Sequence, residues 1–293
     1  PTLVAIDRIA GALIAAVLGI GIVWVVAGAI VGSARFVNLR PTILASSIVP
    51  RINHMFPSSS HVLGFIARYD PLPTFRGPNI SDIPLPGVQV AGEPAVRGTA
   101  GSVVRVVGEA CGYQVTGSGW VASPHRIVTN AHVVAGESQT SVQIRGVGRA
   151  IPARVIWFDA DNDIAILDAP GVEASPLPIR SSVPAADRSA AMLGFPENGP
   201  FTIRSARIGL TRDVRTTDIT DTRRVVRSVT AFRGVVRHGN SGGPLLNSSG
   251  EVVGTVFAAA VDDVEGGYAI PTSVVLDAIS RETTVSVSTG PCV

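Results

Sequence analysis

The pattern of apolar and polar positions divides the chain into an N-terminal apolar run and a longer mixed region. From Ile9 to Gly32 the sequence has no charged residue, and Arg8 and Arg35 flank this run. About 20 apolar residues span a bilayer as a helix, so the run predicts a transmembrane helix. A secretory signal peptide is one alternative, because Ala27–Ala29 resembles a small-residue cleavage site, but its apolar core is usually about 7–15 residues. A buried core helix is the other.

The segment after the apolar run is rich in proline. Its later part holds Pro71, Pro73, Pro78, Pro84, Pro86 and Pro94. Proline fixes φ and removes a hydrogen-bond donor, so prolines at this density predict an extended spacer. We therefore expect a juxtamembrane segment and linker over residues 36–98, with a domain boundary near Gly98.

After Gly98, short runs rich in Val, Ile and Thr alternate with Gly, Pro and Asn. This rhythm is typical of β-strands separated by turns. One convincing helix follows Pro271, with an apolar face made of Val274, Val275, Ala278 and Ile279. Residues 99–293 are therefore predicted to form two small all-β barrels followed by a C-terminal helix.

Composition and charge remove several classes of function. The chain is 46% apolar and 16% charged, with a formal net charge of +2. The basic residues are scattered, and Arg223–Arg224 is the only adjacent pair, so no nucleic-acid partner is expected. No cluster of His, Cys, Asp and Glu has metal-ligand spacing, and no glycine-rich phosphate loop is present, so we expect neither a metal nor a cofactor.

Three short motifs together carry the residue types of nucleophilic catalysis. TNAHVV contains His132, DNDIAIL contains Asp163, and HGNSGGP contains Ser241. A serine hydroxyl needs a base within hydrogen-bond reach, and an imidazole accepts that proton and returns it to the leaving amine. A carboxylate orients the imidazole, and glycines let backbone N–H groups face a developing oxyanion. The sequence therefore predicts Ser241 as nucleophile, His132 as base and Asp163 as the orienting acid.

Other interpretations of these motifs are weaker. GNSGG also fits the GxSxG turn of α/β-hydrolases, but those enzymes place a histidine after the serine, and no histidine follows Ser241. Asp163 is preferred over Asp159 and Asp161 because it directly precedes an apolar strand. We interpret His238, beside the nucleophile, as a surface or pocket residue.

The motifs TNAH, DNDIAIL and GNSGGP resemble the active-site motifs of trypsin-like, chymotrypsin-fold serine proteases, especially the HtrA-like branch. GSGW at residues 117–120 resembles the strand before the histidine strand of that branch, and the resemblance covers about residues 99–293. The upstream apolar helix, the spacer and the two cysteines are similar to the actinobacterial membrane-bound periplasmic MarP-type acid-resistance proteases. These carry a CvpA-like membrane region of several helices, of which residues 1–35 would hold the last.

The resemblance also implies the rest of the site. The N–H groups of Gly239 and Ser241 are expected to form the oxyanion hole. The substrate pocket is expected to be lined by Val235, Phe257, Ala258, Ala259, Gly267 and Tyr268. None of these is acidic, so we expect uncharged side chains at P1, the substrate residue on the acyl side of the scissile bond.

One residue departs from the digestive enzymes of the same family. In those enzymes an aspartate precedes the nucleophile and pairs with the ammonium group that zymogen cleavage releases. Here the position is Asn240, which carries no charge. The departure predicts an active site that forms without a newly cut N-terminus.

Cys111 and Cys292 are the two cysteines, at opposite ends of the predicted folded domain. An even count in a domain beyond a membrane anchor favours a disulfide, whereas two unrelated buried thiols are the alternative.

These observations predict a membrane-anchored serine endopeptidase in the cell membrane, with its protease domain on the extracytoplasmic, periplasmic side. We expect protein or peptide substrates of the cell envelope, lipid contact through residues 9–32 and a monomeric protease domain. The resemblance implies a role in acid and oxidative stress resistance. One alternative is a catalytically silent binding or chaperone module that keeps the protease fold, and another is a structural membrane scaffold in which the anchor is the working part.

Overall fold

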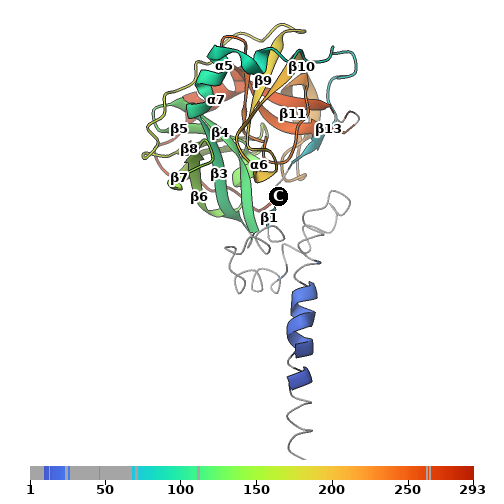
Figure 1. Cartoon of the computed structure of the whole chain (residues 1–293), viewed down its shortest axis with the longest axis vertical. Helices are drawn as coiled ribbons and strands as arrows, with labels where there is room; N and C mark the ends of the chain where they lie inside the picture. The colour runs from blue at the N-terminus through green and yellow to red at the C-terminus, as the bar shows by residue number, and fades with distance from the viewer. Residues whose placement is uncertain are drawn as a thin grey trace, which may run out of the picture. The chain divides into compact units, whose positions relative to one another are not determined.

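The structure is a computed structural model that describes residues 72–110, 113–261, 263 and 265–293 (Figure 1). It also describes residues 10–12, 14–23, 26 and 46 and the backbone of Arg68–Tyr69. The chain divides into two compact units: Pro1–Tyr69 with Cys111–Gln114, and Asp70–Ala110 with Val115–Val293.

The first unit contains the start of the apolar run and the short strand β1 (Arg68–Tyr69). Residues 10–12, 14–23 and 26 are helical. Their large apolar side chains are exposed, namely Ile14, Val17, Leu18, Ile20, Ile22, Val23 and Val26. Among the residues described, none of the helices has both the length and the apolar character needed to span a bilayer. The rest of the predicted span, between residues 9 and 32, lies outside the described residues.

The first barrel consists of antiparallel strands of a sheet that closes on itself. Along the chain these strands are β3 (Val103–Ala110), β4 (Tyr113–Ser123), β5 (Arg126–Thr129), β6 (Glu137–Ile144), β7 (Ile151–Asp159) and β8 (Ile164–Asp168). Their order in the sheet is β4-β3-β6-β7-β8-β5, and an additional β4–β5 pairing closes the barrel. Alternating apolar side chains fill its interior, including Val106, Val121, Ile127, Val155 and Leu167.

The second barrel also closes on itself, and its strands pair antiparallel apart from the short strand Thr74–Phe75. Its strands are β2 (Thr74–Phe75), β9 (Ser189–Gly194), β10 (Thr202–Thr217), β11 (Arg224–Arg233), β12 (Pro244–Asn247), β13 (Val252–Ala260) and β14 (Gly266–Pro271). They lie in the order β12-β9-β10-β11-β14-β13-β2, with an additional β12–β13 pairing. Buried Met192, Ile208, Phe232, Val253 and Val256 share one core cluster inside it.

Short helices link the strands, and one longer helix follows them. The short ones are η2 (Val90–Gly92), α5 (Pro94–Gly98), η3 (Thr99–Ser102), α6 (Ala131–Val134) and η4 (Pro196–Asn198). The longer helix, α7 (Thr272–Arg281), buries Val275 and Ala278, and Val274 and Ile279 pack against the same core. The predicted double barrel with a C-terminal helix is confirmed.

The described part of the predicted spacer differs from the expectation. Phe75, Ile80 and Ile83 are 7%, 3% and 6% exposed and belong to the core cluster of the protease unit. Arg233 Nη1 also donates a 3.0 Å hydrogen bond to the carbonyl of Ile83. The extended backbone that proline favours leaves carbonyl groups available to such donors. The segment is thus packed onto the second barrel, and the compact unit begins at Asp70 rather than near Gly98.

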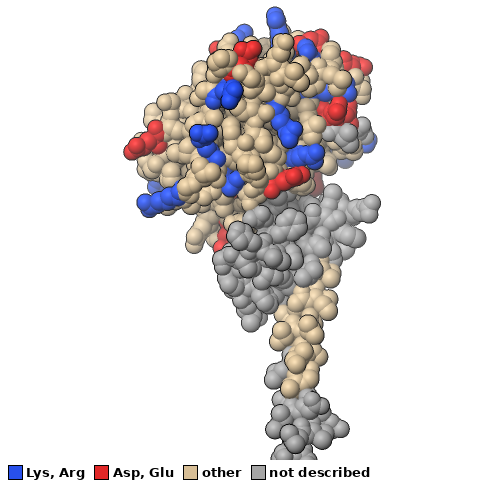
Figure 2. All heavy atoms as spheres, in the orientation of Figure 1, with Lys and Arg blue, Asp and Glu red and all other residues tan. Residues whose placement is uncertain are grey.

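Charges on the protease unit are mixed in sign. In the view of Figure 2, Arg side chains and acidic side chains are interspersed over the visible face and do not gather in one basic stripe. The visible face therefore carries no strong field of one sign.

Candidate active site

His132 and Asp163 lie against each other on the first barrel. His132 is in the single turn α6 after β5, and Asp163 is in the turn that enters β8. Asp163 Oδ2 is 2.7 Å from His132 Nδ1, and Oδ1 accepts the backbone N–H of His132 at 2.9 Å. The two side chains are only 2% and 1% exposed. This pairing favours a proton on Nδ1, which leaves Nε2 as the proton acceptor of a neutral imidazole.

The backbone around Asp163 explains how the carboxylate reaches the histidine. Asp163 has φ of 59°, in the left-handed region, which Asp tolerates better than most residues. Asn130, just before α6, donates from Nδ2 to the carbonyl of Asp163 at 2.9 Å. This hydrogen bond connects the turn of His132 to the turn of Asp163, in addition to the bonds between His132 and Asp163 themselves.

The two other acids of the DNDIAIL region are engaged elsewhere. Asp159 Oδ1 accepts the N–H groups of Asp161 and Asn162 at 2.9 and 3.0 Å, which closes a local turn. Asp161 forms a short ion pair with Arg223. Of the three candidate acids, only Asp163 contacts His132 among the contacts of the described residues.

Ser241 is fully buried in the turn before β12. Its Oγ and the Nε2 of His132 are both buried, and neither has a hydrogen-bond partner among the described residues. A buried polar atom without a partner costs about 1–3 kcal/mol, so such atoms are rare unless function requires them. Catalytic hydrogen bonds are often unformed without substrate and tighten when it binds.

Two carbonyl groups of the serine turn are held from outside it. Glu197 N–H donates to the carbonyl of His238 at 2.6 Å, and Ser118 Oγ donates to the carbonyl of Gly239 at 2.6 Å. Gly239 has φ of +83°, and a Cβ there would lie 2.3 Å from the carbonyl oxygen of Phe195. Only glycine therefore fits this position.

The bond from Glu197 orients the N–H of Gly239, one of the two groups that the resemblance assigns to the oxyanion hole. In a trans peptide the C=O and N–H groups point in opposite directions. Since the His238 carbonyl is turned toward Glu197, the N–H of Gly239 points the other way. The N–H groups of Gly239 and Ser241 donate to no acceptor within the described part of the chain.

Asn240 closes the turn by neutral hydrogen bonds. Its Oδ1 accepts the N–H of Arg237 at 2.9 Å, and its own N–H donates to the carbonyl of Arg237 at 3.0 Å. Its carbonyl accepts the N–H of Gly243 at 2.9 Å. Asn240 is 1% exposed, and its buried Oδ1 has a hydrogen-bond donor in the backbone N–H of Arg237, which is uncharged.

The residues that the resemblance assigns to the substrate pocket lie on β13, on β14 and in the loop after β11. Phe257, Ala258, Gly267 and Tyr268 are buried, whereas Val235 and Ala259 are half-buried. Gly267 lies against Phe232 and Val236, where a Cβ would come within 2.6 Å of a side-chain atom of each. Their role in substrate binding stays a prediction.

Two of these side chains make a contact that the sequence did not predict. The Phe75 ring centroid lies 5.3 Å from that of Phe257 and 5.2 Å from that of Tyr268, both edge to face. The buried guanidinium of Arg227 lies 5.4 Å from the Phe257 ring centroid. The region around Phe257 therefore already contains a positive charge.

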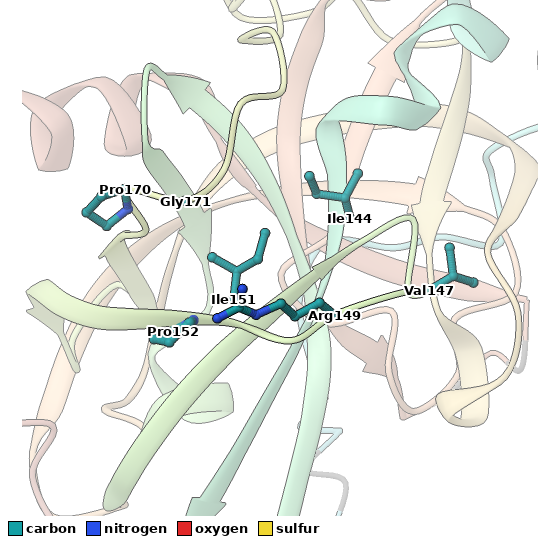
Figure 3. Close-up of a pocket in the computed structure, with 7 residues that line it drawn as sticks. All are labelled: Ile144, Val147, Arg149, Ile151, Pro152, Pro170 and Gly171. Carbon is teal, nitrogen blue, oxygen red and sulfur yellow. The ribbon is translucent and has the colours of Figure 1, made fainter.

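A separate surface cavity of 590 Å³ lies on the first barrel (Figure 3). Its lining is formed by Ile144, Val147, Arg149, Ile151, Pro152, Pro170 and Gly171. None of the predicted catalytic residues lines this cavity.

The predicted disulfide is only partly within the described residues. Cys292 is disulfide-bonded, whereas Cys111 lies outside the described residues. The Sγ of Cys292 lies beside Gly136, where a Cβ would come within 2.5 Å of it. The Cys111–Cys292 pairing stays a prediction.

Comparison with known proteins gives a consistent family. Residues 117–254 match the family described as the trypsin-like peptidase domain. The serine protease Rv3671c of Mycobacterium tuberculosis is 30% identical over 98% of this chain and 75% of its own length. The chain belongs to the trypsin-like serine proteases. It is therefore a serine endopeptidase by family.

Solved structures agree with this assignment. The active form of the Rv3671c protease superposes with a TM-score of 0.71 at 35% identity, covering 75% of this chain and 98% of that one. Its inactive form gives a TM-score of 0.62 at 33% identity, covering 69% and 99%. A further sequence relative, Protease Do-like 1 of Arabidopsis thaliana, is 33% identical over 55% of this chain, and the match covers 38% of that relative's length.

The sequence analysis did not predict the role of Ser118 or the contacts that residues 75–78 make with Phe257 and Tyr268. Ser118 stands in the GSGW motif, which was noted only as a strand, and its hydroxyl bridges the N–H of Phe195 and the carbonyl of Gly239. A lone serine between glycines carries no chemical signal in the sequence, because its partners are far away along the chain.

Proposed function

We propose that this protease hydrolyses peptide bonds through a triad of Ser241, His132 and Asp163 and an acyl-enzyme intermediate. The observation that carries the proposal is the buried His132–Asp163 pair, 2.7 Å between Nδ1 and Oδ2, together with the unpartnered Ser241 Oγ and His132 Nε2. A substrate carbonyl bound near Ser241 Oγ would bring the serine and histidine into a productive hydrogen bond.

The chemistry follows from these atoms. Ser241 Oγ attacks the carbonyl carbon while His132 Nε2 takes the hydroxyl proton, and Asp163 stabilises the imidazolium through Nδ1–H. The oxygen that becomes negative is met by the N–H groups of Gly239 and Ser241. Collapse of the tetrahedral species breaks the C–N bond, and Nε2–H protonates the leaving amine. Water then attacks the acyl-enzyme by the same route and releases the acid and the serine hydroxyl.

The first experiment tests the nucleophile and separates this proposal from the silent-module alternative. A fluorophosphonate probe should label the wild-type full chain at Ser241 and should not label Ser241→Ala. Peptide hydrolysis should be lost in the same variant. A folded wild-type protein that neither reacts with the probe nor cleaves peptides would support the binding or chaperone module instead. The two unoccupied N–H donors of the serine turn favour the enzyme, because a silent module does not need them.

We also propose that residues 9–32 anchor the protein in a membrane. The described residues of this run are helical, and apolar side chains such as Val17 and Ile22 are 66% and 63% exposed. A helix that is apolar on all sides needs an apolar environment. The full chain should therefore stay in the membrane fraction during alkaline carbonate extraction, whereas a variant with charged residues at Leu18 and Ile22 should be released.

The proposed location of the protease domain is extracytoplasmic, and the proposed Cys111–Cys292 disulfide belongs with it. Disulfides persist in oxidising compartments, so both proposals are supported by the disulfide-bonded state of Cys292. Reporter fusions at the C-terminus should report an extracytoplasmic position, and a cytoplasmic report would contradict it. The resemblance further supports a role in acid and oxidative stress resistance, which survival of cells that carry Ser241→Ala would test.

A further inference from the structure

Residues 72–80, which we call the strap, lie along one edge of β13. Within the strap, β2 pairs in parallel with the end of β13. The N–H of Ala259 donates to the carbonyl of Pro73 at 3.1 Å, and the N–H of Val261 donates to the carbonyl of Phe75 at 3.3 Å. The chain's own strap therefore occupies two main-chain donors of this edge.

The turn that carries Ser241 bonds to the same edge of β13. β14 pairs along the opposite edge, whereas β12 and β2 share this one. The N–H of Gly242 donates to the carbonyl of Val256 at 2.8 Å, and the N–H of Val256 donates to the carbonyl of Gly243 at 2.9 Å. The turn that carries Ser241 is thus attached to β13 at Val256. The strap is attached to β13 three residues further on, at Ala259, roughly 10 Å along an extended strand.

A peptide substrate that extends from Ser241 along β13 would add a strand to this edge through main-chain hydrogen bonds. We propose that the strap closes the edge from Ala259 onward and so limits main-chain pairing to the substrate residues beside Phe257 and Ala258, about two on the acyl side of the scissile bond. This inference rests on the proposed catalytic role of Ser241. Longer substrates gain additional pairing only when the strap moves away.

Side-chain contacts hold the strap in this position. The hydroxyl of Tyr268 accepts the N–H of Gly77 at 3.1 Å and donates to the carbonyl of Pro78 at 3.1 Å. Phe75 is 7% exposed and packs edge to face against Phe257 and Tyr268. The strap is therefore part of the site and not a passive tether, and its removal requires the loss of aromatic packing and of several hydrogen bonds.

Gly77 in the strap and Gly87, which follows the strap along the chain, provide a matched pair of variants. A Cβ at Gly77 would lie 2.6 Å from Tyr268 Cε1 and 3.0 Å from Phe75 Cε1, so Gly77→Ala displaces the strap. A Cβ at Gly87 would meet no atom within 4 Å, so Gly87→Ala leaves the strap in place. Both variants are made in the full chain. Phe75→Ala is a second way to loosen the strap, because it removes the buried ring instead of crowding it.

The experiment measures kcat/KM for peptides with a constant sequence around the scissile bond and two to six residues on the acyl side. In the wild type and in Gly87→Ala, kcat/KM should change little beyond two residues. In Gly77→Ala and Phe75→Ala it should rise about tenfold further by five residues, which is the effect of one or two added main-chain hydrogen bonds. The ratio between long and short peptides is insensitive to any change at the P1 pocket.

Amide hydrogen exchange at Ala259 and Val261 reports whether the strap has moved. Both amides should be protected in the wild type and in Gly87→Ala and should exchange faster in the two loosened variants. A wild-type rate constant that keeps rising to six residues would overturn the proposal. The proposal would also be overturned if amide exchange showed that the strap is released in the loosened variants while kcat/KM for long peptides did not increase. If the wild type cleaves the shortest peptide and Ser241→Ala does not, the proposed catalytic function holds. Either negative outcome then counts against the strap alone.

Discussion

The hydroxyl of Ser118 donates a 2.6 Å hydrogen bond to the carbonyl of Gly239, which lies two residues before the proposed nucleophile Ser241. The same oxygen accepts the N–H of Phe195 at 3.1 Å, and the backbone N–H of Ser118 donates to the carbonyl of Ser241 at 2.7 Å. Ser118 is fully buried on β4 of the first barrel, whereas the serine turn belongs to the second. One side chain thus connects the two barrels beside Gly239, a residue of the predicted oxyanion hole.

Ser118→Ala should lower kcat by about tenfold to a hundredfold with little change in KM. Ser118 is a positioning residue, so its loss should cost less than the loss of an oxyanion donor itself, about 3–4 kcal/mol. The variant leaves the Gly239 carbonyl and the Phe195 N–H without their partner and lets the turn reorient. Active-site titration distinguishes slower turnover from a smaller folded fraction. Ser138→Ala, which removes an exposed hydroxyl that bonds Glu109, is the control and should behave as wild type. A changed KM with an unchanged kcat would contradict the positioning role.

The predicted triad should act as one unit. Asp163→Asn keeps the size of the side chain but loses the carboxylate that accepts from both Nδ1 and the backbone N–H of His132. It should lower kcat by several orders of magnitude, about 10⁴-fold in comparable enzymes. The double variant His132→Ala/Ser241→Ala should be no slower than either single variant, because triad members are not additive. Multiplicative losses in single-turnover kinetics would argue for independent roles.

Residues in short catalytic motifs can be recognised in the sequence, whereas contacts between residues far apart along the chain cannot. His132, Asp163 and Ser241 stand out because catalysis restricts residue type and chain order within short motifs. The strap does not stand out, because dense proline indicates only that regular helix is absent. The burial of Phe75 depends on Phe257 and Tyr268, nearly 200 residues away. Ser118 is hidden for the same reason, since its bond to Gly239 joins residues 121 positions apart.

Glu137 should make the stability of the folded protein depend on pH. Its carboxyl group is buried beside Gly108, Oε2 accepts from the Thr140 hydroxyl, and Oε1 has no partner among the described residues. Burial raises the pKa of Glu137 from 4.5 to about 8, although the hydrogen bond from Thr140 opposes the shift. Between these two values the folded state holds a proton that the unfolded state has released. The free energy of unfolding should therefore fall as pH rises from 4.5 to 8, by about 1.4 kcal/mol per pH unit at most.

Denaturant titrations at several pH values test the contribution of Glu137. Glu137→Gln keeps the neutral shape, so it should flatten this pH dependence and stabilise the protein most near pH 8, with little effect below pH 4.5. Glu173→Gln, at an exposed carboxylate, is the control and should leave the slope unchanged. A slope in Glu137→Gln equal to that of the wild type would show that Glu137 is not buried in its neutral form.

The P1 preference should be for uncharged side chains. None of the predicted pocket residues is acidic, and the Arg227 guanidinium lies 5.4 Å from the Phe257 ring centroid. An unpaired Lys or Arg buried there would cost several kcal/mol. A peptide library with all residues at P1 should yield cleavage after neutral residues, and Arg227→Leu should relax the exclusion of cations without creating a preference for them. Cleavage dominated by P1 Arg in the wild type would refute the assigned pocket.

The last prediction is that cutting the chain upstream of the protease unit does not switch on catalysis. Asn240 carries no charge, and its Oδ1 is already bonded to the N–H of Arg237, so the turn offers no aspartate to a newly released ammonium group. Hydrogen bonds from Glu197 and Ser118 already fix the carbonyl groups of the two residues before Asn240, which are His238 and Gly239. A site for a sequence-specific protease inserted after Ser58 in the full chain would separate the protease unit, which begins at Asp70, from the apolar run. The kcat for a short peptide should be the same before and after the cut, and acetylation of the new N-terminus should change nothing. A large rise in kcat upon cleavage that acetylation abolishes would mean that a free ammonium group orders the serine turn despite Asn240.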